Sequence, residues 1–258
     1  MPWVLRGLRN GVVTTAYPKR PDPYATAFRA AVDVRPDAVE SAPGMAQVCP
    51  TGAITEDRGT VSLDRGRCIL CGACVRAFPH TFAWVGGSDT ATSDPRTLVV
   101  PPDLDETNDG VDQVRAELAR RVRRLRRSVH IRHVDAGSDG SEEWEIQALI
   151  NPTYDVHRLG IFFTASPRHA DILLVTGAGA RGMLAPLQRT QIAMPNPVVV
   201  IAVGTDAISG GLVGSTYATT GGLLDQLDVD VVVPGSPPPP FAILHGILLA
   251  LGRVPETA

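Results

Sequence analysis

Residues 68–74 read CILCGAC, which places three cysteines at the spacing C-x2-C-x2-C, and residues 49–54 read CPTGAI, which supplies a fourth cysteine upstream. These four are all the cysteines of the 258-residue chain. The short spacing requires a tight loop whose thiolates and backbone N–H groups point to one place, and the distant cysteine closes the cage. The pattern therefore predicts a metal centre held by Cys49, Cys68, Cys71 and Cys74.

This arrangement resembles the bacterial ferredoxins, in which a C-x2-C-x2-C run gives three ligands and the C-P of the other half gives the fourth. The resemblance implies one [4Fe–4S] cluster. A second C-P would stand where the chain has Phe78-Pro79, and the second three-cysteine run would fall on Val39, Ala42 and Met45. We therefore interpret this part as a two-cluster ferredoxin reduced to one cluster. Four thiolates also suit zinc, although zinc sites usually pair C-x2-C with another C-x2-C or with H-x3-5-H.

The composition is that of a globular chain long enough for two domains, with 44% hydrophobic residues, a net charge of −3 and a pI of about 6.1. These values carry no signal for nucleic acid. Cysteines that all bind one cluster leave none for disulfides, which fits a reducing compartment. Neither a signal peptide nor an apolar stretch of roughly 20 residues is present. We expect a cytoplasmic protein that is soluble or peripheral to a membrane.

Changes in composition and in hydrophobic pattern divide the chain into four parts. Residues 1–30 form an N-terminal lead-in, and residues 31–85 form the ferredoxin-like unit, in which the alternation of residues 60–63 predicts a strand. Residues 86–128 form a linker rich in Gly, Ser, Thr and Pro that leads into a basic amphipathic helix at 111–129. The arginine face of that helix either meets an anionic membrane or an acidic partner, or is simply solvated.

Residues 129–258 alternate short β-branched runs with helical patterns. The predicted strands are Val129–Val134, Asp171–Thr176, Val198–Val203 and Val229–Val233. The predicted helices are Glu143–Ile150, a stretch around Leu184–Gln191, Thr220–Leu227 and Phe241–Leu251. This order favours an open parallel sheet. The fold class is therefore an α+β ferredoxin-like N-terminal domain joined to an α/β, flavodoxin-like C-terminal domain.

A formal nucleotide-binding pattern follows one predicted strand. Residues 177–182 read GAGARG, and Asp206 stands roughly where a ribose-binding acid would be. Against this, Pro186 interrupts the helix pattern and leaves little room for a helix N-terminus that binds pyrophosphate. The competing interpretation is a loop that only turns from strand to helix.

The C-terminal half carries a series of motifs in a fixed order, among them VDAGS at 134–138, EIQAL at 145–149, ASPRHADI at 165–172 and PG at 234–235. They resemble the small subunits of membrane-bound energy-converting [NiFe] hydrogenases and the 20 kDa subunit of respiratory complex I. The N-terminal half, with GVVTT at 11–15, resembles the ferredoxin-type subunit of the same complexes, here fused. The resemblance implies large-subunit and membrane-subunit partners on the inner face of the cell membrane, with a soluble electron carrier as a further partner.

This family's small subunit holds a proximal [4Fe–4S] cluster with four cysteines. Those positions fall here on Asp139, Glu142, Asp206 and Ser236. Because thiolates are needed to hold such a cluster, the proximal cluster is predicted to be absent. Three converging carboxylates would repel, so that either a proton raises the pKa of one of them or a hard cation such as Mg²⁺ or Ca²⁺ neutralises them. The alternative is that the loops have reopened and the acids are solvated.

Together these features indicate a non-catalytic electron-transfer and docking subunit of a hydrogenase-like or complex I-like assembly. It would carry one [4Fe–4S] cluster and no catalytic residue. Two alternatives stay open: a structural module in which the cluster only holds the fold together, and a nucleotide-dependent oxidoreductase that uses residues 177–182. Reversible reduction of the cluster separates the first alternative from the leading hypothesis, and cofactor binding by the C-terminal half identifies the second.

Overall fold

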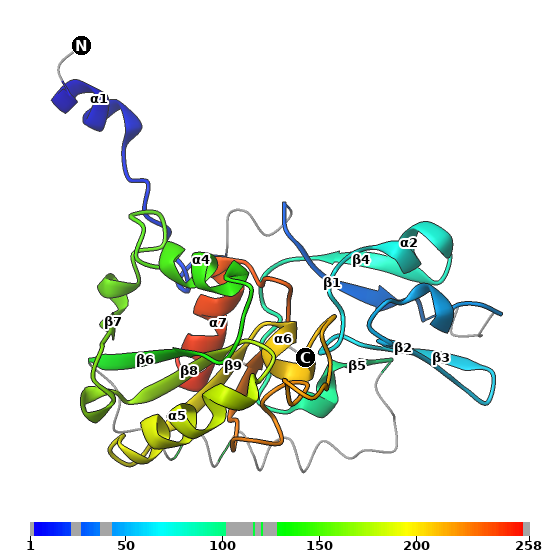
Figure 1. Cartoon of the computed structure of the whole chain (residues 1–258). Helices are drawn as coiled ribbons and strands as arrows, with labels where there is room; N and C mark the ends of the chain where they lie inside the picture. The colour runs from blue at the N-terminus through cyan, green and yellow to red at the C-terminus, as the bar shows by residue number, and fades with distance from the viewer. Residues whose placement is uncertain are drawn as a thin grey trace.

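The computed structural model describes residues 3–21, 27–36, 43–101, 116, 120 and 128–254 (Figure 1). Apart from residues 116, 120, 128 and 129, the predicted basic helix at 111–129 lies outside the described residues. Val39 and Ala42, two of the positions that would carry a second cysteine run, also lie outside them. Among the described helices, none combines the length and the apolar character needed to cross a bilayer.

The N-terminal helix α1, Trp3–Asn10, projects away from the rest of the chain and has no buried residue (Figure 1). The segment that follows is anchored on the C-terminal half. The Thr15 N–H donates to the Thr153 carbonyl at 2.8 Å, and the hydroxyl of the buried Tyr17 lies 2.9 Å from Nδ1 of His245. The lead-in therefore packs on the C-terminal half of the chain, far from it in the sequence.

Two small antiparallel sheets make up the N-terminal half. Strand β1, Arg29–Val34, pairs with β4, Phe82–Gly86, while β2, Ile54–Asp57, pairs with β3, Thr60–Asp64, and β3 pairs with β5, Val99–Val100. A short 3-10 helix, Ala46–Val48, precedes β2, the helix α2, Ala73–Ala77, precedes β4, and a second 3-10 helix, Pro95–Leu98, precedes β5. The predicted strand at 60–63 is confirmed, and its alternation buries Val61 and Leu63 against Phe82.

The C-terminal half is built on a five-stranded parallel sheet in the order β10-β9-β8-β6-β7. Read from the other edge, this is the flavodoxin-like order 2-1-3-4-5, so the predicted α/β class is confirmed. The strands are β6 (Val129–Asp135), β7 (Ile161–Phe163), β8 (Ile172–Thr176), β9 (Val199–Val203) and β10 (Val231–Val233). Helices α4 (Ser141–Ala148) and α7 (Pro240–Ala250) pack on one face, and α5 (Arg181–Ile192) and α6 (Thr205–Ser209) pack on the other.

Burial on both faces explains the composition of this sheet. Every residue of β8 and β9 is buried, as expected for parallel strands covered by helices on both sides. All eleven residues of α7 are buried as well, which is the behaviour of a helix that is apolar on all sides. Two short 3-10 helices, Val156–Leu159 and Pro167–His169, lie in the connections that flank β7.

The four predicted strands and three of the four predicted helices are confirmed with small shifts of boundary. The prediction of a helix at Thr220–Leu227 is wrong, because this segment consists of bends and turns. Gly222 has φ of +107°, and a Cβ on it would lie 2.6 Å from the Ile208 carbonyl oxygen, so the chain turns tightly against α6. The hydrophobic pattern also did not predict β7 and α6, which are too short to show a helical or strand periodicity. Helix α5 continues through Pro186.

The two halves are in direct contact. Thr92 and Val232 exchange backbone hydrogen bonds of 3.0 and 2.9 Å, which adds a bridge beside β10. On the other side, the Thr205 hydroxyl donates to the Cys68 carbonyl at 3.1 Å, and the Ser209 hydroxyl donates to the Gly66 carbonyl at 3.0 Å. Helix α6 therefore lies against the loop that leads into the cysteine run.

Candidate metal centre

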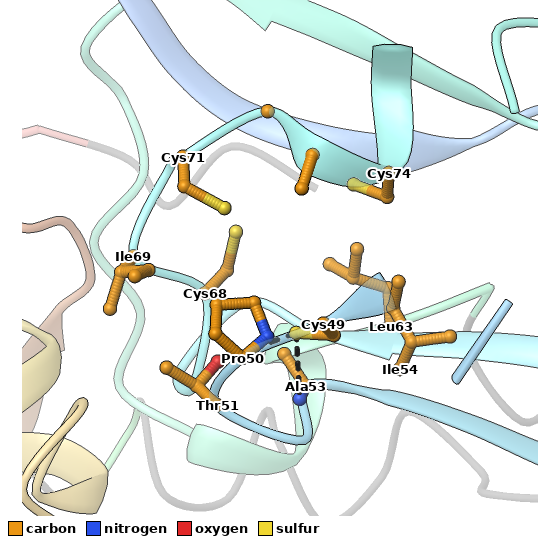
Figure 2. Close-up of a pocket in the computed structure, with 12 residues that line it drawn as sticks. Cys49, Pro50, Thr51, Ala53, Ile54, Leu63, Cys68, Ile69, Cys71 and Cys74 are labelled. Atoms are coloured by element: carbon orange, nitrogen blue, oxygen red, sulfur yellow. Dashed lines mark hydrogen bonds between the residues drawn. The ribbon is translucent and has the colours of Figure 1, made fainter. Parts of the chain in front are cut away.

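The four cysteines come together from two loops and a helix. Cys49 follows the 3-10 helix Ala46–Val48, Cys68 and Cys71 lie in the loop before α2, and Cys74 lies within α2. Figure 2 shows their side chains directed toward one space, which is a pocket of about 300 Å³ open in part to solvent. The pocket wall is otherwise mainly apolar and includes Pro50, Ala53, Ile54, Leu63 and Ile69.

Polar contacts at Cys49 favour the thiolate form. The Ala53 N–H donates to Cys49 Sγ at 3.2 Å, and the Thr51 hydroxyl lies 3.4 Å from the same sulfur. Burial alone would raise the pKa of Cys49, but these hydrogen bonds and those of the Thr51 and Ile54 N–H groups lower it on balance. The Thr51 hydroxyl also donates to the Arg67 carbonyl at 2.7 Å, and so connects the two cysteine-bearing loops.

The thiols of Cys68 and Cys74 resist ionisation in the absence of a cation. Burial raises the pKa of Cys68 to about 11, and the neighbouring charges of Cys74, Cys49 and Cys71 act in the same direction. Burial likewise raises the pKa of Cys74, with further contributions from Cys49 and Cys71. A metal bound in the pocket would deprotonate such thiols outright, since a coordinated thiol is held as the thiolate. The donor set, four thiols that line one mainly apolar pocket, therefore fits an iron–sulfur cluster.

A second set of predicted residues gathers at the carboxyl edge of the parallel sheet. Asp139 and Glu142 follow β6, Asp206 follows β9 and Ser236 follows β10. Because the carboxyl ends of parallel strands meet at one edge, Asp139, Glu142 and Asp206 come close enough for their charges to act on one another. Glu142 packs on the backbone of α6, since a Cβ on Gly204 would lie 2.5 Å from its Oε1. Ser236 follows Gly235, whose carbonyl accepts from the Thr205 N–H at 2.7 Å.

The predicted alternative of solvated acids is wrong for Glu142, whose side chain is 0% exposed. Its Oε2 accepts from the Ser141 hydroxyl at 3.0 Å, whereas Oε1 has no hydrogen-bond partner among the described residues. Burial raises the pKa of Glu142 to about 7, and the charges of Asp206 and Asp139 add to this shift. Asp139 is exposed, and hydrogen bonds from the Ser141 hydroxyl and N–H lower its pKa.

The structure does not support equally the two ways of relieving the repulsion among Asp139, Glu142 and Asp206, which are protonation of one acid and binding of a cation. Within the described ranges, no group of three or more His, Cys, Asp or Glu side chains has the arrangement needed to hold a single metal ion. A cation shared by Asp139, Glu142 and Asp206 therefore has no geometric support. Protonation of Glu142 fits its burial and its raised pKa, because a neutral carboxylic acid is far less costly to bury than a carboxylate.

Several backbone N–H groups of the glycine-rich loop at 177–182 already have partners within the protein. The N–H groups of Ala178, Ala180 and Arg181 donate to the carbonyls of Gly137, Ala136 and Ala218, at 3.2, 2.7 and 2.8 Å. Pyrophosphate-binding loops need such N–H groups for the ligand. These contacts favour a loop that turns from β8 to α5, although α5 itself is longer than Pro186 suggested.

The sequence patterns did not predict a polar network that lies at the same edge of the sheet as Asp139 and Glu142. Glu143 accepts from the Ser138 hydroxyl at 2.7 Å and from the Thr176 hydroxyl at 2.5 Å, and its Oε1 lies 3.5 Å from Nε2 of His133. Burial lowers the pKa of His133 despite the nearby Glu143 and Asp135. The one available signal was that these polar residues lie at or just beyond the ends of β6 and β8. Glu143 thus fixes α4 to the sheet and leaves Glu142 to face α6.

Replacement of Gly204 by alanine is expected to destabilise the protein by about 1–3 kcal/mol. Gly204 has φ of +92°, and the added Cβ would lie 2.5 Å from Glu142 Oε1. The matched control is Gly182→Ala within α5, where a Cβ has no neighbour within 4 Å. Thermal denaturation of both variants should show a lower midpoint for Gly204→Ala alone, and equal midpoints would contradict the close packing of Glu142 on α6.

Comparisons with known proteins identify the C-terminal half. The family model described as NADH ubiquinone oxidoreductase, 20 Kd subunit, matches residues 140–250. The probable membrane-bound hydrogenase subunit mbhJ of Pyrococcus furiosus is 41% identical over 128 residues, which cover 50% of this chain and 77% of that protein.

Formate hydrogenlyase subunit 7 of Escherichia coli is 38% identical over 163 residues, or 63% of this chain, which spans 62% of the length of that relative. An NADH-quinone oxidoreductase subunit of Rhizobium meliloti is 42% identical over 104 residues, covering 40% of this chain and 62% of that relative. The chain therefore belongs to the family that contains the 20 kDa subunit of NADH ubiquinone oxidoreductase and the corresponding subunits of membrane-bound hydrogenases.

Proposed function

We propose that the chain is an electron-transfer and docking subunit of a membrane-associated assembly of the hydrogenase or complex I type. It carries one [4Fe–4S] cluster in a ferredoxin-like unit at residues 31–85, fused to the small-subunit-like domain at 129–258. The observation that carries this proposal is the convergence of four thiols in one mainly apolar pocket: Cys49, Cys68, Cys71 and Cys74.

A cluster accounts for this site better than a zinc ion does. Each cysteine of a [4Fe–4S] cluster binds a different iron, so the four sulfurs stand farther apart than around one tetrahedral ion. The four thiols influence one another's ionisation, and their spacing lacks the second C-x2-C or the H-x3-5-H that zinc sites usually pair with the first C-x2-C. The sequence C-P-T-G-A-I before β2 supplies the remote ligand that the ferredoxin pattern requires.

The protein's own residues hold the cluster and tune it. When bound, the cluster supplies one-electron transfer. The Ala53 N–H at Cys49 Sγ stabilises negative charge there, and the walls formed by Ile54 and Leu63 limit solvent access. Hydrogen bonds to sulfur and solvent exposure both set the reduction potential of such a site. The lead-in at residues 1–30 and the segment at 86–128 would join this unit to its partners and to the second domain.

The proximal cluster of the family is proposed to be lost. Asp139, Glu142, Asp206 and Ser236 occupy the positions of its ligands, and none of them supplies a thiolate. Electrons on the remaining cluster therefore lack the family's usual next centre within this subunit. Its C-terminal domain then serves to dock a large subunit. The name of one relative, a probable membrane-bound hydrogenase subunit, favours a place in a membrane-bound complex. We propose that this place is at the inner face of the cell membrane, with large and membrane subunits as partners.

The test is the metal content and reducibility of the anaerobically purified protein. We expect about four irons and about four acid-labile sulfides per chain, with one S = 1/2 EPR signal after reduction by dithionite. About eight irons with a second signal would overturn the loss of the proximal cluster. Iron that cannot be reduced reversibly would indicate the structural alternative, and zinc in place of iron would reject the cluster.

A further inference from the structure

The buried acid Glu142 stands where the family resemblance puts a cluster ligand. Its side chain is 0% exposed, and its Oε1 has no hydrogen-bond partner within the described part of the chain. A carboxylate is costly to bury with an oxygen left unsatisfied, whereas the neutral acid is tolerated. The site therefore accommodates Glu142 best when it carries a proton.

Two further acids face Glu142 from neighbouring segments. Asp206 belongs to α6, and Asp139 lies in the loop before α4. Both charges oppose the ionisation of Glu142. The two acids themselves differ. Ser141 stabilises Asp139 as the anion. Burial and the charge of Asp139 raise the pKa of Asp206. Environments that push the pKa values of adjacent acids apart are typical of sites that handle protons.

Ser141 connects the buried acid with the surface. Its hydroxyl donates to Glu142 Oε2 at 3.0 Å, and its N–H donates to Oδ1 of the exposed Asp139 at 2.9 Å. The Ser141 side chain is half-buried. A hydroxyl both accepts and donates hydrogen bonds, so that of Ser141 relays a proton from water to Glu142. Ser141 and Glu142 therefore form a short route from solvent into the interior.

Glu142 is also close to the cysteine loop. Its carboxyl group lies against Gly204, because a Cβ there would be 2.5 Å from Oε1. The next residue, Thr205, donates its hydroxyl to the Cys68 carbonyl at 3.1 Å. The buried carboxyl and the cysteine loop thus contact adjacent residues of one short helix. A change of charge at the cysteine loop therefore alters the proton affinity of the Glu142 carboxyl, because electrostatic screening is weak in the protein interior.

We propose that the cluster held by the four cysteines, when it accepts one electron, raises the proton affinity of Glu142, which then takes up a proton from water through Ser141 wherever it is still ionised. The inference rests on the proposed function. The electron comes from a low-potential one-electron donor and stays on the cluster, and the proton forms an O–H bond with the Glu142 carboxylate. The proton thereby compensates the added negative charge. A pKa of about 7 places this uptake in the physiological range.

The test is a potentiometric titration of the whole protein with EPR detection, between about pH 5 and about pH 9. An increase of about tenfold in the proton affinity of Glu142 on reduction would lower the potential by about 59 mV from the acidic to the alkaline limit. Glu142→Gln should abolish this decrease. Asp225→Asn, which removes an exposed carboxylate, is the control and should retain it.

Iron is counted in each sample first, so that the two proposals fail differently. A protein without iron removes the cluster and the linkage together. A loaded protein whose pH dependence is the same in the wild type and in Glu142→Gln removes the linkage alone. If Glu142→Gln does not fold, infrared difference spectra of the wild type decide the question: a protonated-carboxyl band that grows on reduction supports the proposal, and its absence overturns it.

Discussion

Replacement of Cys68 by serine is expected to remove nearly all iron from the purified protein, a loss of more than about tenfold. A serine hydroxyl ionises far less readily than a thiol and does not replace a thiolate on iron. Cys68 also carries the carbonyl that binds α6 through Thr205, and serine keeps that backbone contact. The measurement is iron and acid-labile sulfide per chain after anaerobic purification, together with circular dichroism.

The corresponding serine variants of Cys49, Cys71 and Cys74 should behave alike, because each thiolate binds a different iron. Ser236→Ala is the matched control. It removes a hydroxyl from a position where the family resemblance puts a ligand of the proximal cluster, and it should leave the iron content unchanged. A Cys68→Ser protein that keeps about four irons would contradict the assignment of this ligand. Iron loss in Ser236→Ala would indicate that the second site still binds metal.

Replacement of Glu142 by glutamine is expected to remove a pH dependence of stability. The folded protein raises the pKa of Glu142 from 4.5 to about 7, so the native state binds more protons than the unfolded state between these values. Stability is therefore greatest below the unfolded pKa and is lost as pH rises through about 7. The full loss is about 3 kcal/mol. Glutamine fills the same space without ionising, so the variant should be more stable than the wild type at alkaline pH.

The measurement is the difference in thermal midpoint between variant and wild type across the pH range, under anaerobic conditions. At alkaline pH the variant should melt roughly 6–12 °C higher, since about 1 kcal/mol corresponds to 2–4 °C for a chain of this size. Toward acidic pH the two proteins should converge. Asp225→Asn again serves as the control. Parallel pH curves for Glu142→Gln and the wild type would show that Glu142 is already ionised in the native state.

Much of the fold follows from local pattern. Continuous apolar runs such as ILLVT in β8 and VVIAV in β9 predict strands buried on both faces, and the structure has them there. The prediction of a helix at Thr220–Leu227 also failed for a local reason. Two adjacent glycines take left-handed conformations there and turn the chain against α6. Strand β7 and helix α6 are too short for any period to reveal them.

The spacing of Cys68, Cys71 and Cys74 by itself determined that these three thiols meet, because a tight C-x2-C-x2-C loop brings its thiols together in almost any fold. The fourth thiol, Cys49, comes from a separate segment that the fold brings to the same pocket. The chemistry of Glu142 was decided only by the tertiary structure. Sequence marked it as one of three acids at former ligand positions, but nothing local distinguishes it from Asp139. The parallel sheet brings the ends of β6 and β9 to one edge, where α6 covers Glu142 and leaves Asp139 exposed. Desolvation by that packing is what raises the pKa of Glu142, whereas hydrogen bonds from Ser141 lower the pKa of the exposed Asp139.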